Sequence, residues 1–185
     1  FLPLNASKIK KIAIIGELAK ERNIGDKGSS YVKPAYVVNI LDGIKNYLGN
    51  NTEVIFSDGA NIEEAKNLAK SVDAVVLVAG YKWNDEGEYV VNNPENRGEK
   101  SDEGGDRESL RLNNNDVQLI NQVSTANPNT LVSLIGGSAI IMEKWQQVPK
   151  AVIMAWYPGM EGGNALANII FGKVNPSGKL PFTIP

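Results

Sequence analysis

Short apolar runs alternate with amphipathic segments along most of this chain. The runs are rich in β-branched residues, as is typical of strands buried on both faces, and they span residues 11–16, 54–56, 73–79, 130–135 and 151–156. Between them, apolar residues recur at helical spacing over residues 37–48, 61–72, 117–123 and 164–171. This alternation predicts an α/β fold with a mostly parallel sheet and helices on both faces.

Individual residues indicate where these elements end. Pro34 suits the first turn of a helix that Gly49 would terminate. Asn61 is expected to cap the next helix, and Asn115 or Asp116 the one after the residues 81–114. Residues 178–184 predict a closing strand, and Pro181 within it favours an antiparallel edge position. The sheet is therefore expected to have six strands.

Two shorter segments are also interpreted from their composition. Residues 140–147 predict a short helix whose Trp145 packs against the sheet. Gly162 and Gly163 are expected to let the following helix approach the sheet closely. Trp156, at the end of the last central strand, is interpreted as a packing residue rather than as a platform for a sugar ring.

Composition restricts the chemistry open to this protein. The 185 residues carry a net charge of −2 and contain neither Cys nor His. The length is that of one domain, the charge gives no electrostatic reason to expect nucleic acid as a partner, and no apolar run is long enough to cross a membrane. Without Cys and His, acid–base chemistry is left to Asp, Glu, Lys or Tyr.

No cofactor or metal is called for by the sequence motifs. Gly16, at the end of the first strand, stands alone where a dinucleotide-binding pattern needs three glycines, and no P-loop pattern occurs. Ser138 follows two glycines in a turn that resembles a nucleophile turn, but no His is present to activate it.

The most unusual stretch is the acidic segment 81–114. It follows the buried strand 73–79 and holds nine of the 21 acidic residues. Loops of this length are uncommon in compact domains unless they are functional or disordered, and ligands of open α/β sheets bind at the carboxyl ends of strands. The segment is thus either a catalytic loop or a solvated acidic flap. Trp83 within it, and Asp26 and Ser29 in the glycine-rich segment 25–30, are candidate substrate-binding residues.

A fixed series of motifs identifies a resemblance. Gly105-Asp-Arg107, Asn127-Pro128, Gly136-Gly-Ser138 and the segments 155–163 and 171–185 occur in the order seen in the C-terminal domain of glycoside hydrolase family 3, the family of β-glucosidases and β-xylosidases. The resemblance extends over essentially the whole chain, and its last third is the most specific part.

The resemblance implies a six-stranded α/β sandwich that packs on a (β/α)8-type barrel domain of the same protein. Residues 1–10 would be the linker from that N-terminal barrel, and residues 11–185 the single sandwich domain. In the family the barrel supplies the nucleophilic Asp and the sandwich supplies the general acid/base, in a retaining exo-acting mechanism. The implied substrate is a β-glucoside or an oligosaccharide, with no nucleic acid, membrane or cofactor, and the isolated chain is expected to be inactive.

Three carboxylates of the acidic segment are candidates for the acid/base. Counting from Gly80 as in several family members selects Glu86, whereas a Gly-Glu-Tyr pattern selects Glu88 and a Glu-Gly-x-Asp-Arg pattern selects Glu103. Glu86 ranks first. Trp83 and Tyr89 would provide the apolar wall that such an acid needs.

The neighbouring residues Asp106 and Arg107 could be ligands of sugar hydroxyl groups. They are interpreted instead as an intradomain pair that fixes the acidic segment where it re-enters the fold. The alternative for the whole chain is a non-catalytic structural or carbohydrate-binding module of a glycosidase.

Overall fold

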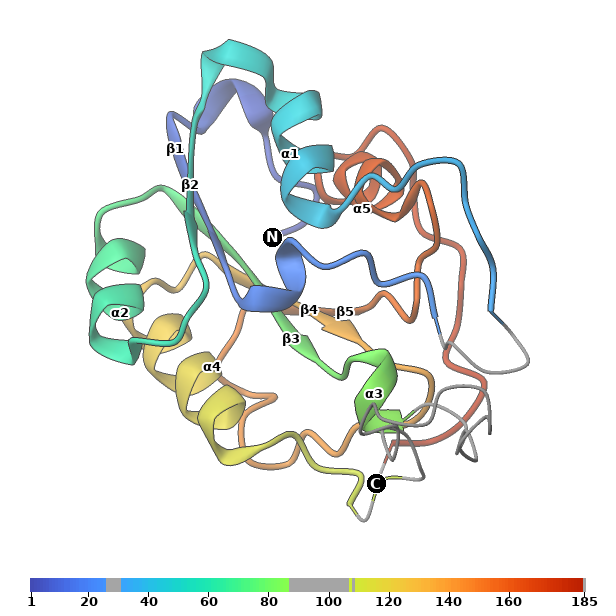
Figure 1. Ribbon diagram of the computed structural model, residues 1–185. Helices are drawn as coiled ribbons and strands as arrows, with labels where there is room; N and C mark the ends of the chain where they lie inside the picture. The colour runs from blue at the N-terminus through green and yellow to red at the C-terminus, as the bar shows by residue number, and fades with distance from the viewer. Residues whose placement is uncertain (26–30, 87–106, 108, 185) are drawn as a thin grey trace, which may run out of the picture.

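The computed structural model describes residues 1–25, 31–86, 107 and 109–184 (Figure 1). Its centre is one parallel sheet of five strands in the order β2-β1-β3-β4-β5. The strands are β1 (Lys11–Ile15), β2 (Glu53–Ser57), β3 (Ala74–Gly80), β4 (Thr130–Ile135) and β5 (Ala151–Met154). The predicted α/β class and parallel sheet are confirmed.

Helices cover both faces of this sheet (Figure 1). On one face α1 (Ile40–Leu48) packs against α5 (Gly162–Ile170), and on the other α2 (Ile62–Lys70) packs against α4 (Asn114–Ala126). A single helical turn, α3 (Trp83–Glu86), follows β3, and the 3-10 turns η1 (Ala6–Lys8), η2 (Glu17–Ala19) and η3 (Gly49–Asn51) complete the described helical elements.

Alternation along the strands produces two separate cores. In β1, Ile12 and Ile14 face the core under α1 and α5, whereas Ala13 and Ile15 face the core under α2 and α4. The other strands divide in the same way, because successive side chains of a strand point to opposite faces. Each fully buried Ile contributes about 1.5–3 kcal/mol, so both faces stabilise the fold.

Asparagine side chains begin three of the helices. Asn39, Asn61 and Asn113 are the N-caps of α1, α2 and α4, and each accepts a hydrogen bond from a backbone N–H of the first turn. This satisfies N–H groups that have no partner within the helix. Of these caps only Asn61 was predicted; the cap of α4 is Asn113 rather than the expected Asn115 or Asp116.

Two further polar side chains join distant segments. The carboxylate of Asp73 accepts hydrogen bonds from the backbone N–H groups of Lys10 (2.7 Å) and Lys11 (2.9 Å), which ties the starts of β1 and β3 together. Asn127 is buried; its Nδ2 donates to the carbonyl oxygens of Ala69 (2.8 Å) and Val72 (2.9 Å) at the end of α2.

Helices α1 and α5 approach each other at two glycines. A Cβ on Gly43 would lie 2.6 Å from the backbone nitrogen of Asn164 and closer still to the carbonyl group of Gly163. A Cβ on Gly163 would lie 2.8 Å from the carbonyl oxygen of Val38. Gly163 therefore permits a close approach as expected, but to α1 rather than to the sheet.

The predicted sixth strand is wrong. Residues 178–184 contain no strand, so the described sheet has five strands and β5 is at its edge. The segment is held by side chains instead: the ring of Phe182 packs edge-on against Trp156, with ring centroids 5.7 Å apart. Pro181 has no N–H to donate to a neighbouring strand.

Two helix predictions also need correction. The first helix begins at Ile40 rather than near Pro34, because the backbone of Val38 is bonded elsewhere: its N–H donates to Met160 (2.8 Å) and its carbonyl accepts from Gly163 (2.9 Å). Residues 142–147 form turns rather than a helix, although Trp145 is buried against the sheet as predicted.

The first ten residues pack onto the domain. Leu4 and Ile9 belong to the core under α1 and α5, and the N–H of Leu4 donates to the carbonyl oxygen of Ile170 (2.8 Å). The assignment of this segment as a linker from a barrel domain stays a prediction.

Candidate functional site

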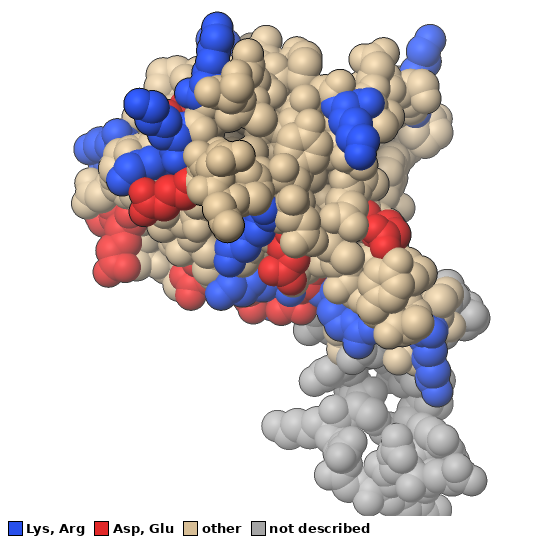
Figure 2. Space-filling model, turned by 90° about the horizontal axis from the view of Figure 1, so that it is seen from above, with Lys and Arg blue, Asp and Glu red and all other residues tan. Residues whose placement is uncertain are grey.

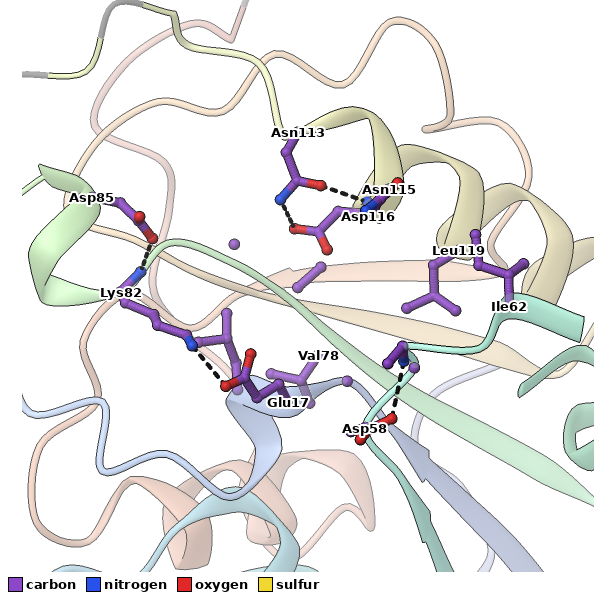
Figure 3. A pocket seen from close by; sticks show the side chains of 16 residues that line it. Glu17, Asp58, Ile62, Val78, Lys82, Asp85, Asn113, Asn115, Asp116 and Leu119 are labelled. Carbon is purple, nitrogen blue, oxygen red and sulfur yellow. Dashed lines mark hydrogen bonds and ion pairs between the residues drawn. The ribbon is translucent and has the colours of Figure 1, made fainter. Parts of the chain in front are cut away.

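The strand order creates a switch point between β1 and β3. The chain leaves β1 toward β2 on one side and leaves β3 toward β4 on the other, and the crevice outside such a point is where open α/β sheets bind ligands. A cavity of about 700 Å³ lies there, at the carboxyl ends of these strands (Figure 3). The fold therefore places a hollow beside the start of the acidic segment.

The polar lining of this cavity is largely paired. Lys82 reaches across to Glu17 (Nζ–Oε1 2.7 Å), as Figure 3 shows, and this bond raises the pKa of Lys82. The carboxylate of Asp85 accepts from the backbone N–H of Lys82 (2.7 Å), and that of Asp58 accepts from the N–H of Ala60 (2.9 Å). These carboxylates thus already stabilise the local backbone.

Asp116 is the most perturbed acid of the cavity. Burial raises its pKa to about 6, against the opposing effects of hydrogen bonds from the backbone of Gly80 and the side chain of Asn113. The Asn113 bond measures 3.0 Å and is drawn in Figure 3. Burial thus favours the protonated form of Asp116. It was expected as a possible helix cap, and its place in a cavity was not predicted.

A second cluster lies beside the cavity, where β3 and β4 end. Glu86, the last residue of α3, pairs with Arg107 at 3.2 Å between Oε2 and Nε. The side chains of Glu86 and Arg107 are only 9% and 7% exposed. Glu86 also accepts a hydrogen bond from the backbone N–H of Gly137 in the turn after β4. The candidate acid/base is thus held at the carboxyl edge of the sheet.

Aromatic rings enclose this pair. The guanidinium carbon of Arg107 lies 4.1 Å from the centroid of the Tyr81 ring, a cation–π arrangement. Burial, followed by the negative charge of Glu86 and a hydrogen bond with it, raises the pKa of Tyr157. The Tyr157 hydroxyl therefore remains protonated, and it donates to the carbonyl oxygen of Lys82 (3.4 Å).

The structure locates only part of the predicted site. Glu86 lies at the strand ends as expected, and Trp83 begins the same helical turn, α3. The other predicted residues lie outside the described part of the chain: Glu88, Glu103, Asp26, Ser29, Tyr89 and Asp106. Their roles stay predictions.

Arg107 bonds within the domain, but the predicted pairing with Asp106 lies outside the described residues and stays a prediction. Its described partners are Glu86, Ser138 and Ala139. The Gly136-Gly-Ser138 motif after the neighbouring strand was the signal that could have indicated this, because the ends of adjacent parallel strands lie at one edge of the sheet.

Two searches of the described residues gave no further site. Among them, no group of three or more acidic side chains is arranged to hold a metal ion. No helix in the described ranges has the length and apolarity needed to cross a membrane.

In the view of Figure 2, Lys, Arg, Asp and Glu side chains are interspersed over the described surface rather than separated by sign.

Fold and site together define an α/β sandwich domain with a carboxylate held at the carboxyl edge of its sheet. The family model of the glycosyl hydrolase family 3 C-terminal domain matches residues 1–185. The chain belongs to this family, and the resemblance inferred from its motifs is confirmed.

Three relatives illustrate the match. The chain is 33% identical to a β-xylosidase of Formosa agariphila, over 100% of this chain and 25% of the relative. It is 35% identical to an exo-α-(1→6)-L-arabinopyranosidase of Bifidobacterium longum, over 100% of this chain and 24% of the relative. It aligns with the crystal structure of the β-D-glucoside glucohydrolase of Trichoderma reesei with a TM-score of 0.82 and 29% identity, over 100% of this chain and 27% of that one. The chain thus spans about a quarter of the length of these relatives.

Proposed function

We propose that this chain is the second domain of a retaining exo-β-glycosidase, with β-glucosides as the favoured substrate, and that it supplies the general acid/base. The nucleophilic Asp and most sugar contacts would come from an N-terminal (β/α)8-type barrel domain of the same protein. Residues 1–10 would be the linker between the two. Family membership and the coverage of the relatives support this division of roles.

The observation that carries the proposal is the position of Glu86. In a chain without His or Cys, a carboxylate at the end of β3 is placed where a partner domain that covers this edge would meet it. Retaining glycosidases hold their two carboxyl groups about 5–5.5 Å apart.

The test uses the full-length protein with Glu86→Ala and aryl β-glucosides with good and poor leaving groups. Loss of a general acid should lower kcat/KM by about 10²–10⁴-fold on phenyl β-glucoside and much less on 2,4-dinitrophenyl β-glucoside. Added azide should restore turnover and form a β-glucosyl azide. Glu143→Ala is the matched control, because Glu143 is exposed and its ion-pair partner in the described part of the chain is Arg111.

Uniform activity of Glu86→Ala across these substrates would refute Glu86 as the acid/base, and the same test then applies to Glu88 and Glu103. If all three variants behave like the parent, the alternative of a non-catalytic module replaces the proposal. The names of the relatives include xylosidase and arabinopyranosidase, so β-xylosides and α-L-arabinopyranosides belong in the substrate panel. A higher kcat/KM on either would correct the substrate and leave the domain's role intact.

A further inference from the structure

Arg107 contacts Glu86 and residues that follow β3 and β4, while its Nη1 has no hydrogen-bond partner among the described residues. Its Nε faces Glu86 Oε2 (3.2 Å), its Nη2 donates to the carbonyl oxygen of Ala139 (3.0 Å) and to the hydroxyl of Ser138, and its flat face lies on the ring of Tyr81. The guanidinium group is therefore fixed by two consecutive residues after β4 and by one residue after β3. Its orientation does not depend on Glu86.

The other contacts of Glu86 are equally restrictive. Its Oε1 accepts from the N–H of Gly137, and a Cβ added to Gly137 would lie 3.0 Å from Oε1 and 3.3 Å from the ring of Tyr157. A side chain at residue 137 would therefore have to displace the Glu86 carboxylate or the Tyr157 ring by a few tenths of an ångström. The residues after β4 thus bond to both members of the pair: the N–H of Gly137 donates to Glu86, and Ser138 and Ala139 accept from Arg107.

Burial makes this arrangement sensitive to either partner. Removing charges from water is costly, and an ion pair in a protein interior is favourable only when its geometry and hydrogen bonds are good. Arginine suits such a place because its planar group donates in fixed directions and stacks on aromatic rings. The pair is more than nine-tenths buried, and both members are also bonded to residues after β4, although Oε2 of Glu86 and Nη1 of Arg107 have no hydrogen-bond partner among the described residues.

We propose that Arg107 is the positioning residue of Glu86: it sets the orientation of the acid/base carboxylate and, by its charge, the pH range over which that carboxylate acts. The inference rests on the proposed catalytic role of Glu86 and adds to it a partner and a pH control. Arg107 acts through Glu86, and the bonds to Ser138 and Ala139 carry its position over from β4.

The direction of the pH effect follows from the charges around Glu86. Arg107 carries the positive charge that is paired with Glu86, and Tyr157 beside the pair is neutral because its pKa is raised. The β4 turn, Gly136–Ser138, contributes no ionisable side chain. Loss of the guanidinium charge should therefore let the acid keep its proton to higher pH. The basic limb of kcat/KM, which reports the acid in the free enzyme, should move upward.

The experiment compares Arg107→Gln, Arg107→Lys and Arg111→Gln in the full-length protein. Arg107→Gln should lower kcat/KM about 10²-fold on phenyl β-glucoside, as expected for a misplaced catalytic group, and only a few-fold on the 2,4-dinitrophenyl compound. Its basic limb should rise by at least about one pH unit. Arg107→Lys should keep the basic limb of the parent and recover part of the rate. Arg111→Gln is the matched control, since that arginine is exposed on the same segment.

Ser138→Ala provides a milder variant in case Arg107→Gln does not fold. It removes one anchor of the guanidinium group, and it should produce a smaller loss that is again selective for the poor leaving group. Thermal unfolding of every variant separates a loss of folded protein from a loss of activity per folded molecule.

The outcomes separate this inference from the proposed function. If Glu86→Ala shows its selective loss but the Arg107 and Ser138 variants lose activity equally on both substrates, with an unmoved basic limb, Arg107 is structural only and the inference is overturned. If Glu86→Ala shows no selective loss, the catalytic role of Glu86 fails and the inference fails with it. Selective losses with the upward shift of the basic limb would support both.

Discussion

Replacing Gly43 with alanine should destabilise the domain, although the same change usually stabilises a helix. Gly43 lies within α1, where alanine is favoured over glycine by about 1 kcal/mol. Its missing side chain, however, is what allows α5 to approach. The two effects have opposite signs, and the distances decide between them.

The magnitude follows from which atoms the new methyl group would meet. The added Cβ would lie 2.6 Å from the backbone nitrogen of Asn164 and closer to the carbonyl group of Gly163. These are backbone atoms at the start of α5 and cannot rotate away, so the helices must separate. Overpacking of this kind costs about 1–3 kcal/mol and sometimes more. Separation of the two helices would also disturb the hydrogen bond from the Gly163 N–H to the carbonyl oxygen of Val38. We therefore expect the free energy of unfolding to fall by about 2–3 kcal/mol in total.

Thermal unfolding of the 185-residue chain, followed by circular dichroism, measures this loss. For a domain of this size the midpoint should fall by about 4–12 °C. Gly178→Ala is the matched control, because a Cβ at Gly178 would meet nothing within 4 Å; its midpoint should stay that of the parent. A Gly43→Ala midpoint equal to or above that of the parent would refute the close-packing argument.

Three further changes test other contacts. Because the folded pKa of Asp116 is raised from 3.8 to about 6, its stabilising contribution is complete below pH 3.8 and is lost as the pH rises through 6. Asp116→Asn should therefore gain about 2 kcal/mol over the parent at pH 8, after allowance for partial solvent access, and nothing at pH 4, in urea titrations at both pH values. The pKa of Asp73 is lowered by two backbone N–H groups; its contribution is present above the unfolded pKa and lost as the pH falls through the folded one. Asp73→Ala should lower the midpoint by about 2–4 °C at pH 7, with a difference that shrinks below pH 4 in thermal scans. Asn127→Ala leaves buried carbonyl groups unpaired and should cost about 2–4 kcal/mol in urea unfolding; a cost below 1 kcal/mol would contradict that reasoning.

The parts of the fold that were predictable are those set by local patterns. The apolar runs identified all five strands, because each face of a buried strand needs apolar residues and no other element gives such short, β-branched runs. Asn61 was recognisable as a cap since it stands directly before a helical pattern with Glu63 and Glu64 in its first turn. Both features depend on residues within a few positions of each other.

The errors arose where distant segments decide the local structure. The backbone of Val38 bonds to Met160 and Gly163, more than a hundred residues later, and this keeps the chain extended after Pro34. Residues 178–184 have a strand-like pattern, but packing of Phe182 on Trp156 holds them without a strand partner. Propensity does not report such competition.

In the candidate site, too, the feature set by neighbouring residues was predictable and the contact between distant segments was not. Glu86 could be selected because it follows the end of a strand, whereas its pairing with Arg107 depends on two strand ends meeting in space. No spacing in the sequence indicates that residues 86 and 107 are in contact. The raised pKa of Asp116 was equally hidden, since it results from burial in a cavity that four separate segments form.

The Glu86–Arg107 pair also has a consequence for how this domain can be altered. The pair holds residues 86 and 107 in contact. The remainder of the described domain therefore meets the same two positions of the chain, whatever sequence joins them. Doubling the length of a closed loop costs only about 0.6 kcal/mol. We therefore expect the described scaffold to tolerate segments of other lengths, taken from relatives or designed, grafted between positions 86 and 107.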